Sequence, residues 1–424
     1  MIDIDVALEA IRSRTDELDR FTVDLHEALG SVLAEDIVAD IDSPPHDKAI
    51  VDGYALRAAD VRAGSGTFRV VERIVAGDNP HLEVTEGTCS QIMTGAPMPG
   101  GADAVVMWEE TAATHNNSPA SFLGGAMPTS VTVGEQLVRS GQNIMRQAAS
   151  FAVGEKMASR GQVITPPLVG VLAEVGRGVV DVVRRPKVAV LATGDELVEC
   201  RTRPAAGQIR NTNGPMLQAL ATVCGADCAD LGIARDTHKS LRQFIEQGLA
   251  ADVLLISGGV SAGVLDLVPS VLKELGVEQV FHKVRVKPGK PIWFGKQQTP
   301  VKRSGCLVFG LPGNPVSGLV CFELFVRPAL AKLMGLTATT AQPHAGRLES
   351  QYEHHGDRVM YHPAVAHANR TTGWSVKLLP WKGSADLRTM SAANCLAILT
   401  GDPPRLEPGD PIEFQFLGGS GLGI

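Results

Sequence analysis

Three short apolar runs, each followed by a glycine-containing loop and a helical pattern, constrain the fold of this chain more than any other feature. No polar residue interrupts these runs, which is typical of strands buried on both faces of a sheet. Strands that alternate with helices indicate right-handed βαβ units. We therefore predict a parallel α/β sheet, with strands at Val188–Ala192, Val253–Ile256 and Leu307–Phe309 and helices at 214–222, 237–250, 267–275 and 315–333.

The patterns on either side of this region are different. A helical stretch is predicted at Leu25–Leu33, β-rich runs such as Phe68–Val75 follow it, and a polar loop is expected at 115–130. Near the C-terminus, apolar residues alternate with polar ones, as in a half-buried strand. These changes predict four domains: a discontinuous N-terminal linker unit (1–42 and 142–177), an inserted β-rich domain (43–141), an α/β domain (178–334) and a C-terminal β domain (335–424).

Charge, hydropathy and cysteine content exclude several classes of protein. Acidic residues exceed basic ones by 46 − 39 = 7, so we expect the chain to bind neither nucleic acid nor an anionic membrane surface. The N-terminus does not have the pattern of a signal peptide, and no apolar stretch is long enough to cross a bilayer. The seven cysteines lack the spacing of a disulfide framework or a zinc site. These features predict a cytoplasmic protein with ordinary thiols.

The loops after the three apolar strands are the first candidate binding site. Ligands of parallel α/β sheets bind beyond the carboxyl ends of the strands, and glycine lets the backbone approach a ligand closely. One such loop alone is equally compatible with a plain turn. Three on consecutive strands favour a shared binding site, whose candidates are Thr193 and Gly194, then Ser257, Gly258, Gly259 and Ser261, and then Pro312, Gly313, Asn314 and Ser317.

Charged residues gather near these loops in the sequence. Glu196, Asp236 and Asp266 offer carboxylate oxygens, which are the ligands that Mg²⁺ prefers. Ammonium groups at a tight turn suit an oxyanion, and the candidates are Lys283, Lys287 and Lys290, the last of them followed by Pro291. Two ordinary interpretations stay open: the lysines are compatible with a solvated surface, and Asp236 with a cap of the helix that follows it.

The predicted inserted domain contains a second constellation. Asp52 lies on a turn after a proline-rich lead-in, and Thr94 lies on a loop shaped by glycine and proline. An aspartate before a glycine is most often part of ordinary turn chemistry, so the residues alone do not distinguish a structural from a catalytic role here.

Taken together, these motifs resemble the MoeA / gephyrin E-domain family, the molybdopterin molybdenumtransferases. The resemblance implies a MogA-like α/β domain with a doubly wound, mostly parallel sheet, a discontinuous N-terminal dimerisation unit, an inserted β domain that approaches the partner subunit's cleft, and a C-terminal β barrel in a homodimer. It is carried by PPHDKAIVDGYA (44–55), TGAPMPGGADAVV (94–106), ATGDEL (192–197), GIARD (232–236), SGGVSAG (257–263), VKPGKP (286–291) and LPGNPVSG (311–318), and more loosely by KGS (382–384) and AANC (392–395).

The resemblance also implies a reaction and roles for single residues. Adenylylated molybdopterin and molybdate, with Mg²⁺ or a similar divalent cation, would give molybdenum cofactor and AMP, and molybdenum enzymes are possible hand-over partners. Asp52, Thr94, Glu196 and Asp266 match catalytic positions; Glu196, Asp236 and Asp266 match metal positions. The lysines and Ser317 match substrate and oxyanion positions, and Arg358 and Ser384 are further candidates from the last domain.

The sequence departs from the family pattern in three places. His46 and Lys48–Val51 replace most of the usual lead-in to the aspartate, an acidic position near Ser150 is lost, and Val264–Leu265 stand where more polar residues usually precede Asp266. A catalytically weakened paralogue that binds or scaffolds molybdopterin is therefore a second hypothesis. A third is molybdopterin adenylyltransferase activity on the shared α/β domain.

Overall fold

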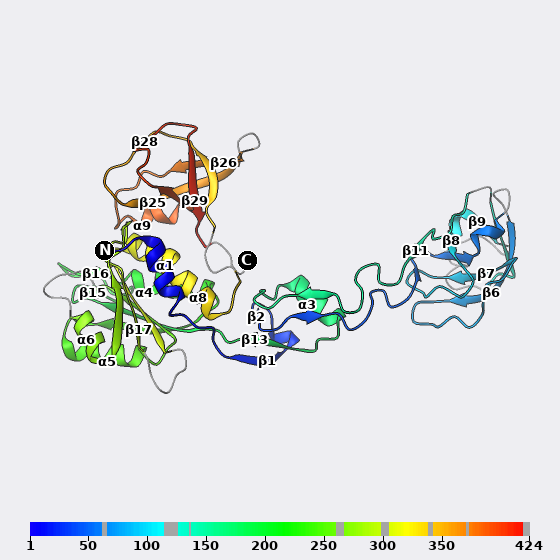
Figure 1. Ribbon diagram of the computed structural model, residues 1–424, viewed down its shortest axis with the longest axis horizontal. Helices are drawn as coiled ribbons and strands as arrows, with labels where there is room; N and C mark the ends of the chain where they lie inside the picture. Colours follow the sequence, from blue (N-terminus) through cyan, green and yellow to red (C-terminus); the bar gives the residue numbers. More distant parts are fainter. Residues whose placement is uncertain are drawn as a thin grey trace. The chain divides into compact units, whose positions relative to one another are not determined.

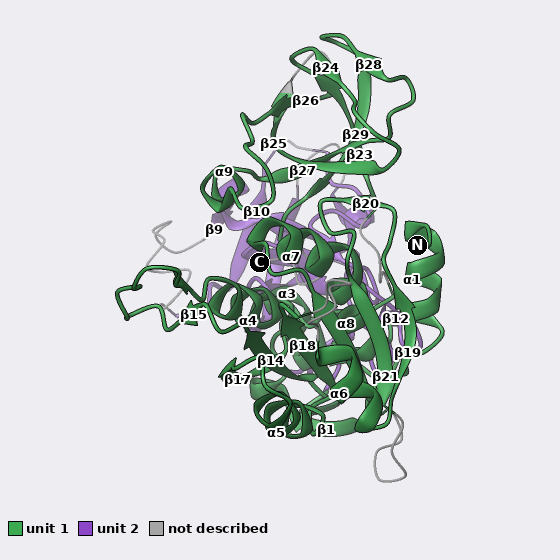
Figure 2. Ribbon diagram, turned by 90° about the vertical axis from the view of Figure 1, so that its left-hand side faces the viewer, with its two compact units in different colours: residues 1–36, 159–173, 177–424 green, residues 37–158, 174–176 purple. Residues whose placement is uncertain are grey.

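The computed structural model describes residues 1–61, 66–113, 126–134, 137–259, 267–297, 305–337, 342–369 and 373–418. They form two compact units (Figures 1 and 2): unit 1 consists of 1–36, 159–173 and 177–424, and unit 2 of 37–158 and 174–176. The division into four domains stays a prediction. Among the described helices, none has both the length and the apolar character needed to cross a membrane.

Unit 1 is built around the predicted α/β sheet. The three apolar runs are its central strands, and their residues are buried. The pairs β14–β17, β14–β18 and β18–β22 are parallel, whereas β21 and β19 add an antiparallel edge. The sheet order is β17 (Asp227–Ala234), β14 (Lys187–Thr193), β18 (Val253–Ser257), β22 (Cys306–Leu311), β21 (Trp293–Gln297) and β19 (Val277–His282).

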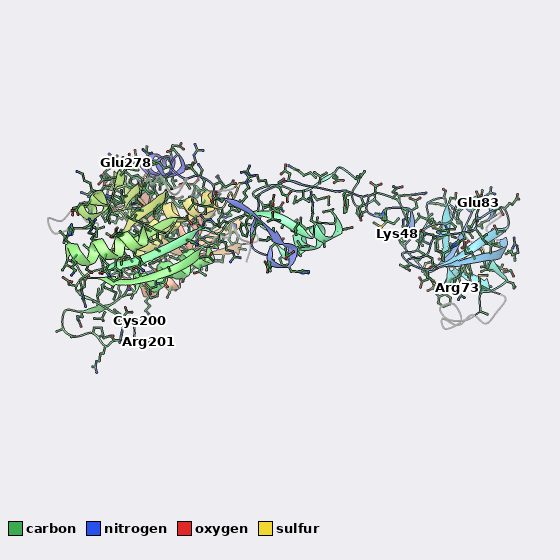
Figure 3. All side chains as sticks on the ribbon, turned by 90° about the horizontal axis from the view of Figure 1, so that it is seen from below. Lys48, Arg73, Glu83, Cys200, Arg201 and Glu278 are labelled. Atoms are coloured by element: carbon green, nitrogen blue, oxygen red, sulfur yellow. The ribbon has the colours of Figure 1, made fainter. Side chains whose placement is uncertain are left out.

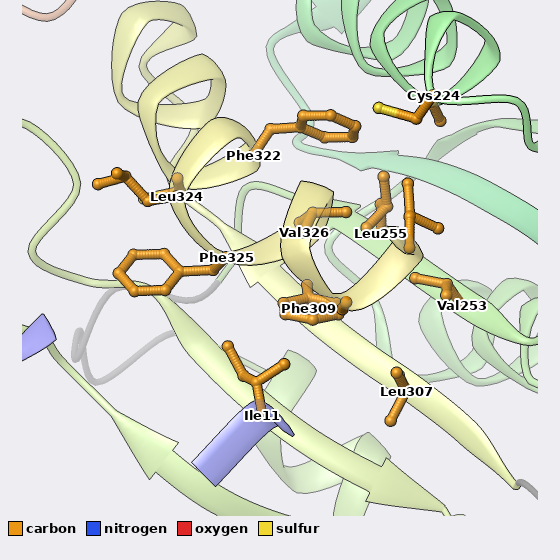
Figure 4. Packing of buried hydrophobic residues seen from close by; sticks show 14 of the residues in the cluster. Ile11, Cys224, Val253, Leu255, Leu307, Phe309, Phe322, Leu324, Phe325 and Val326 are labelled. Carbon is orange, nitrogen blue, oxygen red and sulfur yellow. The ribbon is translucent and has the colours of Figure 1, made fainter. Parts of the chain in front are cut away.

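Helices cover both faces of this sheet because alternate strand residues point in opposite directions. Leu254 packs with α5 (His238–Gly248) and α6 (Val268–Glu274), whereas Leu255 packs with the helices of the other face. Those are α4 (Asn213–Val223), α1 (Ile4–Arg12), α7 (Pro315–Cys321) and α8 (Arg327–Leu333). A π-helical turn, Phe322–Val326, joins α7 to α8, so the predicted helix at 315–333 is continuous. Figure 4 shows Val326 of this helix beside Phe309 of the sheet, in the cluster that also contains Phe322.

The C-terminal strands close into a barrel, as the resemblance implied. Strand β25 pairs with both β26 and β27, and the remaining pairings complete the ring. Two pairs are parallel, β23–β26 and β20–β25, which the alternating pattern did not predict. The strand order is β20 (Val286–Lys287), β25 (Val359–Asn369), β26 (Gly373–Leu378), β23 (His344–Leu348), β29 (Pro411–Phe416) and β27 (Cys395–Leu399), with β24 (Tyr352–Glu353) and β28 (Arg405–Leu406) as a separate pair and α9 (Leu387–Ser391) between β26 and β27.

The predicted helix at Leu25–Leu33 was wrong. This segment forms one 3₁₀ turn, Leu25–Glu27, and then strand β2 (Val32–Leu33). Gly30 lies between them with φ of +76°, a left-handed conformation that ends a helix. Strand β2 joins a sheet with β13 (Val179–Val183) and β1 (Arg20–Asp24), and helix α3 (Pro166–Glu174) precedes β13.

Unit 2 contains a six-stranded sheet, which agrees with the β-rich pattern of its sequence. Its order is β8 (Ala104–Met107), β5 (Gly53–Leu56), β7 (Thr88–Ile92), β6 (Gly66–Ile74), β10 (Ser130–Val133) and β9 (Thr111–Ala113). Two short pairs accompany it, β3 (Ile37–Val38) with β12 (Lys156–Ala158) and β4 (Lys48–Ala49) with β11 (Ile144–Met145). Residues 115–125 of the polar loop predicted at 115–130 lie outside the described residues.

Cysteine chemistry agrees with the sequence. All seven cysteines are free thiols. Cys200 is exposed, on the segment after β15 (Leu197–Val198), which pairs with β16 (Ile209–Arg210) (Figure 3). Burial raises the pKa of the Cys89 thiol to about 12, so this side chain is an inert part of the core.

Candidate active site

The parallel register brings the ends of the central strands together. Ser257 lies opposite both Ala192 of β14 and Leu311 of β22, and Thr193 lies opposite Ala234 of β17. The amide of Gly258 donates to the Leu311 carbonyl at 3.1 Å. The candidate loops after these strands therefore start from one edge of the sheet, here called the glycine edge (residues 193–196, 257–259 and 312–314). Ser261 and Asp266 lie outside the described residues.

Two glycines at this edge have no room for a side chain. Gly258 and Gly259 have φ of +95° and +62°. A Cβ on Gly258 would lie 2.6 Å from the Thr193 carbonyl oxygen, and one on Gly259 would lie 2.9 Å from Thr193 Oγ1. The backbone at Gly258 and Gly259 therefore packs directly against Thr193. The Thr193 hydroxyl is itself buried and has no hydrogen-bond partner, which is the condition expected of a group that a ligand completes.

Asn213 is a buried residue of this edge that the sequence analysis missed. Its Nδ2 donates to Ser257 Oγ at 2.7 Å and to the Gly313 carbonyl at 2.8 Å, which joins the loops after β18 and β22. A carbonyl only accepts, so this contact fixes the orientation of the amide. Oδ1 is then left buried without a donor. A polar residue at the first position of an apolar helix was the available signal, because asparagine is seldom buried without a specific partner.

The candidate metal carboxylates lie at the ends of β14 and β17. Glu196 folds back over Gly194, where a Cβ would lie 2.6 Å from Glu196 Oε2. The Asp236 amide donates to Asp195 Oδ1 at 3.2 Å. The interpretation of Asp236 as a helix cap was wrong, because Thr237 occupies the capping position of α5 and its side chain accepts from the Ser240 amide. Among the described residues, no group of three or more His, Cys, Asp or Glu side chains is arranged to hold a metal ion.

The lysine loop is attached to the barrel by a two-residue strand. Val286 and Lys287 of β20 pair in parallel with Val359 and Met360 of β25. Arg358, directly before β25, donates from Nη1 to the Val286 carbonyl at 3.2 Å. The pairing of β20 with β25 therefore brings Lys287 close to Arg358, although the two residues are 71 positions apart in the sequence.

Below the loop, Cys321 fixes the position of Gly289. The buried Cys321 thiol donates to the Gly289 carbonyl, with a sulfur–oxygen distance of 3.4 Å. A Cβ on Gly289, whose φ is +116°, would lie 2.6 Å from Cys321 Sγ. Burial raises the pKa of this thiol far above its usual range. The loop between Lys287 and Lys290 therefore rests on helix α7 through the glycine.

A cavity of about 510 Å³ opens beside this loop, within unit 1. It collects six of the predicted substrate residues from the α/β region and the barrel: Lys287, Lys290, Pro291, Ser317, Arg358 and Ser384. The Ser384 carbonyl accepts from the Val316 amide at 3.0 Å, which ties the barrel loop to α7. Lys283 is not among the lining residues; its carbonyl accepts from the Ile2 amide at 3.1 Å instead.

The charges of this cavity suit an anion. Lys287, Lys290 and Arg358 form no ion pair within the part of the chain that the structure describes, so their positive charges are not compensated there. Hydroxyl donors are supplied by Ser317 and Ser384. A tetrahedral oxyanion is bound best by ammonium, guanidinium and hydroxyl donors that converge on it.

Unit 2 holds Asp52 and Thr94 together. Asp52 Oδ1 accepts from the Thr94 amide at 2.7 Å and from Thr94 Oγ1 at 2.8 Å. The nearby carboxylate of Asp47 accepts from the Gln147 amide and from Arg146, and these contacts lower its pKa. Asp52 therefore lies within hydrogen-bond distance of Thr94, although the residues that precede it depart from the family pattern.

Three family models cover almost the whole chain. They are the MoeA N-terminal region (domain I and II) at residues 2–176, the probable molybdopterin binding domain at 189–332 and the MoeA C-terminal region (domain IV) at 345–417. A protein of Staphylococcus aureus named molybdopterin molybdenumtransferase is 31% identical over 418 residues, which are 97% of this chain and 95% of that protein. The chain belongs to the MoeA family.

Other MoeA relatives agree with this assignment. A molybdopterin molybdenumtransferase of Staphylococcus epidermidis is 34% identical over 346 residues, which are 80% of this chain and 78% of the relative. The crystal structure of a molybdopterin biosynthesis MoeA protein from Pyrococcus horikoshii matches with a TM-score of 0.80 and 28% identity, over 98% of this chain and all of that one. Two of the three MoeA regions line the cavity: Ser317 lies in the molybdopterin binding region, and Arg358 and Ser384 lie in the C-terminal region.

Proposed function

We propose that this MoeA-family chain inserts molybdenum into adenylylated molybdopterin, releasing AMP and giving molybdenum cofactor. The observation that carries the proposal is the cavity that places Lys287, Lys290 and Arg358, which form no ion pair within the described residues, beside the hydroxyls of Ser317 and Ser384. Relatives that are 31% and 34% identical are named for this transferase activity.

In this proposal the substrates occupy two connected places. Molybdate is held in the cavity by the ammonium, guanidinium and hydroxyl donors. The adenylyl end of the pterin lies along the glycine edge, where Gly258, Gly259 and Gly313 have no side chain to keep a ligand away from the backbone. Helix α7 starts between the two, since Asn314 caps it and Ser317 lies in its first turn.

The carboxylates at the glycine edge fit a magnesium ion. Mg²⁺ is usually bound through one or two carboxylates plus substrate phosphates, and it does not need a complete cage of protein ligands. Glu196 and Asp236 lie at the ends of adjacent parallel strands and offer such oxygens. We propose that they hold the ion with Asp266, and that the ion neutralises charge on the pyrophosphate when it is bound.

The remaining roles are part of the same proposal. Asp52 and Thr94 would act on the reacting groups, the chain would work as a homodimer in the cytoplasm, and the four domains would have the boundaries given above. The hydrogen bonds between Asp52 and Thr94 support an intact site more than a degenerate one.

The proposal is tested by incubating the full-length protein with adenylylated molybdopterin, molybdate and Mg²⁺. We expect AMP release that depends on molybdate, together with cofactor that activates an apo-molybdenum enzyme. A Lys290→Ala variant should lose most of this activity and keep its AMP binding. Tight pterin binding without any AMP release would favour the scaffold hypothesis, and pyrophosphate release from ATP and molybdopterin would favour the adenylyltransferase.

A further inference from the structure

The cavity beside the lysine loop has two chemically different halves. One half carries the three cations and two serine hydroxyls already described. The other half comes from the barrel and is lined by Tyr352, Glu353, His355, Met360, His362 and Trp381. The proposed function uses only the first half.

The volume of the cavity exceeds what an oxyanion requires. Each heavy atom of a small ion takes no more space than a water molecule, about 30 Å³, so a tetrahedral oxyanion needs at most about 150 Å³. The cavity is about 510 Å³, a size typical of sites for larger organic ligands. Most of it is therefore left for a second group.

Rings dominate the second half. The His362 ring packs edge-to-face against Tyr352 and Trp381, with centroid distances of 6.3 and 5.4 Å. His362 Nδ1 lies 2.9 Å from the Pro363 carbonyl, which only accepts, so Nδ1 carries the proton. Burial lowers the pKa of His362. The rings of Tyr352, His362 and Trp381 distinguish this wall from the cationic half.

Glu353 adds an acceptor that an anion site would not contain. Its carboxylate is exposed and lines the cavity. A carboxylate repels a bound oxyanion, but it can accept two N–H bonds from a heterocycle that presents adjacent donors. The ring of a 2-amino-4-oxopterin has such a pair in its amino group and neighbouring ring N–H. Adenine has only its exocyclic amino group.

We propose that the barrel wall formed by Tyr352, Glu353, His362 and Trp381 binds the pterin ring of the substrate, next to the oxyanion held by Lys287, Lys290 and Arg358. The aromatic side chains contact the faces and edges of the ring, and Glu353 accepts from its N–H donors. This inference rests on the proposed function and adds to it, because it assigns the pterin to the barrel and leaves the glycine edge to the nucleotide.

The test measures binding to the intact full-length protein with three separate probes: 6-hydroxymethylpterin, AMP and molybdate. Binding of the neutral pterin is followed by quenching of its ring fluorescence, and binding of the other two by calorimetry. The variants are Trp381→Leu, Glu353→Gln and, as a matched control, Glu413→Gln, which changes an exposed glutamate of the same barrel that does not line the cavity. Glu353 is exposed, so its variant stays informative if the tryptophan variant fails to fold.

We expect Trp381→Leu and Glu353→Gln each to weaken pterin binding about tenfold, with AMP affinity unchanged and Glu413→Gln equal to the wild type. Pterin binding that neither variant alters, or no pterin binding by a protein that binds AMP, would overturn the inference. Loss of AMP affinity in the wall variants would overturn it too, because the wall would then hold adenine. Molybdate-dependent AMP release is measured separately. Pterin binding without AMP release rejects the proposed function alone. AMP release by a protein whose pterin binding is unchanged in both wall variants rejects this inference alone.

Discussion

Replacing Gly289 by alanine should destabilise unit 1 and disorganise the lysine loop. Two costs are expected. A φ of +116° is unfavourable for any residue with a Cβ, by about 1–3 kcal/mol. The new Cβ would also lie 2.6 Å from Cys321 Sγ, and overpacking of this kind costs about 1–3 kcal/mol. The sum is about 2–6 kcal/mol of unfolding free energy, with weaker molybdate binding because Lys287 and Lys290 flank the glycine.

A matched glycine separates the two costs. Gly383 has the same φ of +116°, but a Cβ there would meet no atom within 4 Å, so Gly383→Ala reports the backbone cost alone. The double variant Gly289→Ala/Cys321→Ala removes the sulfur and should restore only the part of the unfolding free energy that is lost through the collision. Urea unfolding is followed by tryptophan fluorescence, since Trp293, Trp374 and Trp381 all lie in unit 1. If Gly289→Ala and Gly383→Ala unfold at the same urea concentration, the close contact between Gly289 and Cys321 adds no cost, and the reasoning is refuted.

Three other changes test the site. Asn213→Ala should cost about 1–3 kcal/mol and weaken AMP binding by calorimetry, because the loops after β18 and β22 lose their common donor; unchanged AMP affinity would contradict this. Thr94→Val should slow AMP release without changing the melting temperature, because Asp52 keeps the Thr94 amide as a donor; a wild-type rate would make the pair structural. Burial lowers the pKa of His362 in the folded state, so its contribution to stability is complete above the ordinary value of 6.5 and is lost as the pH falls below it. His362→Phe should reduce the pH dependence of the unfolding free energy measured by urea titration. An unchanged pH dependence would assign it to another group.

The central sheet could be predicted from the sequence because its signal is local. Each central strand is buried on both faces and is therefore apolar throughout, as in Val253–Ile256. Strands β19, at the edge of the sheet, and β21, next to it, were missed because they mix polar with apolar residues. The segment Leu25–Leu33 failed for another local reason: its composition is compatible with a helix, and only the left-handed conformation of Gly30 ends it.

The candidate site was predictable only where residues follow a strand. Thr193, Ser257 and Gly313 could be placed together because parallel strands end at one edge. The residues of the cavity were grouped only through the family resemblance, because the two-residue strand that brings them together, Val286–Lys287, is too short to have a detectable period. Asn213 was missed because its importance lies in which two groups its amide joins, and that depends on tertiary packing.

The order of residues along helix α7 explains how two such different places can serve one substrate. The Gly313 carbonyl belongs to the glycine edge through Asn213, whereas Ser317 lines the cavity. Gly313 and Ser317 are only four positions apart, with Asn314 extended and Pro315–Ser317 in the first turn of α7, so the two places are separated by no more than about 14 Å of chain. The Val316 amide bonds to the Ser384 carbonyl, so the barrel loop moves with the same helix turn. A ligand with a phosphate between its ring and its nucleotide can therefore contact both places at once, and any substitution that shifts the start of α7 should weaken AMP and molybdate binding together.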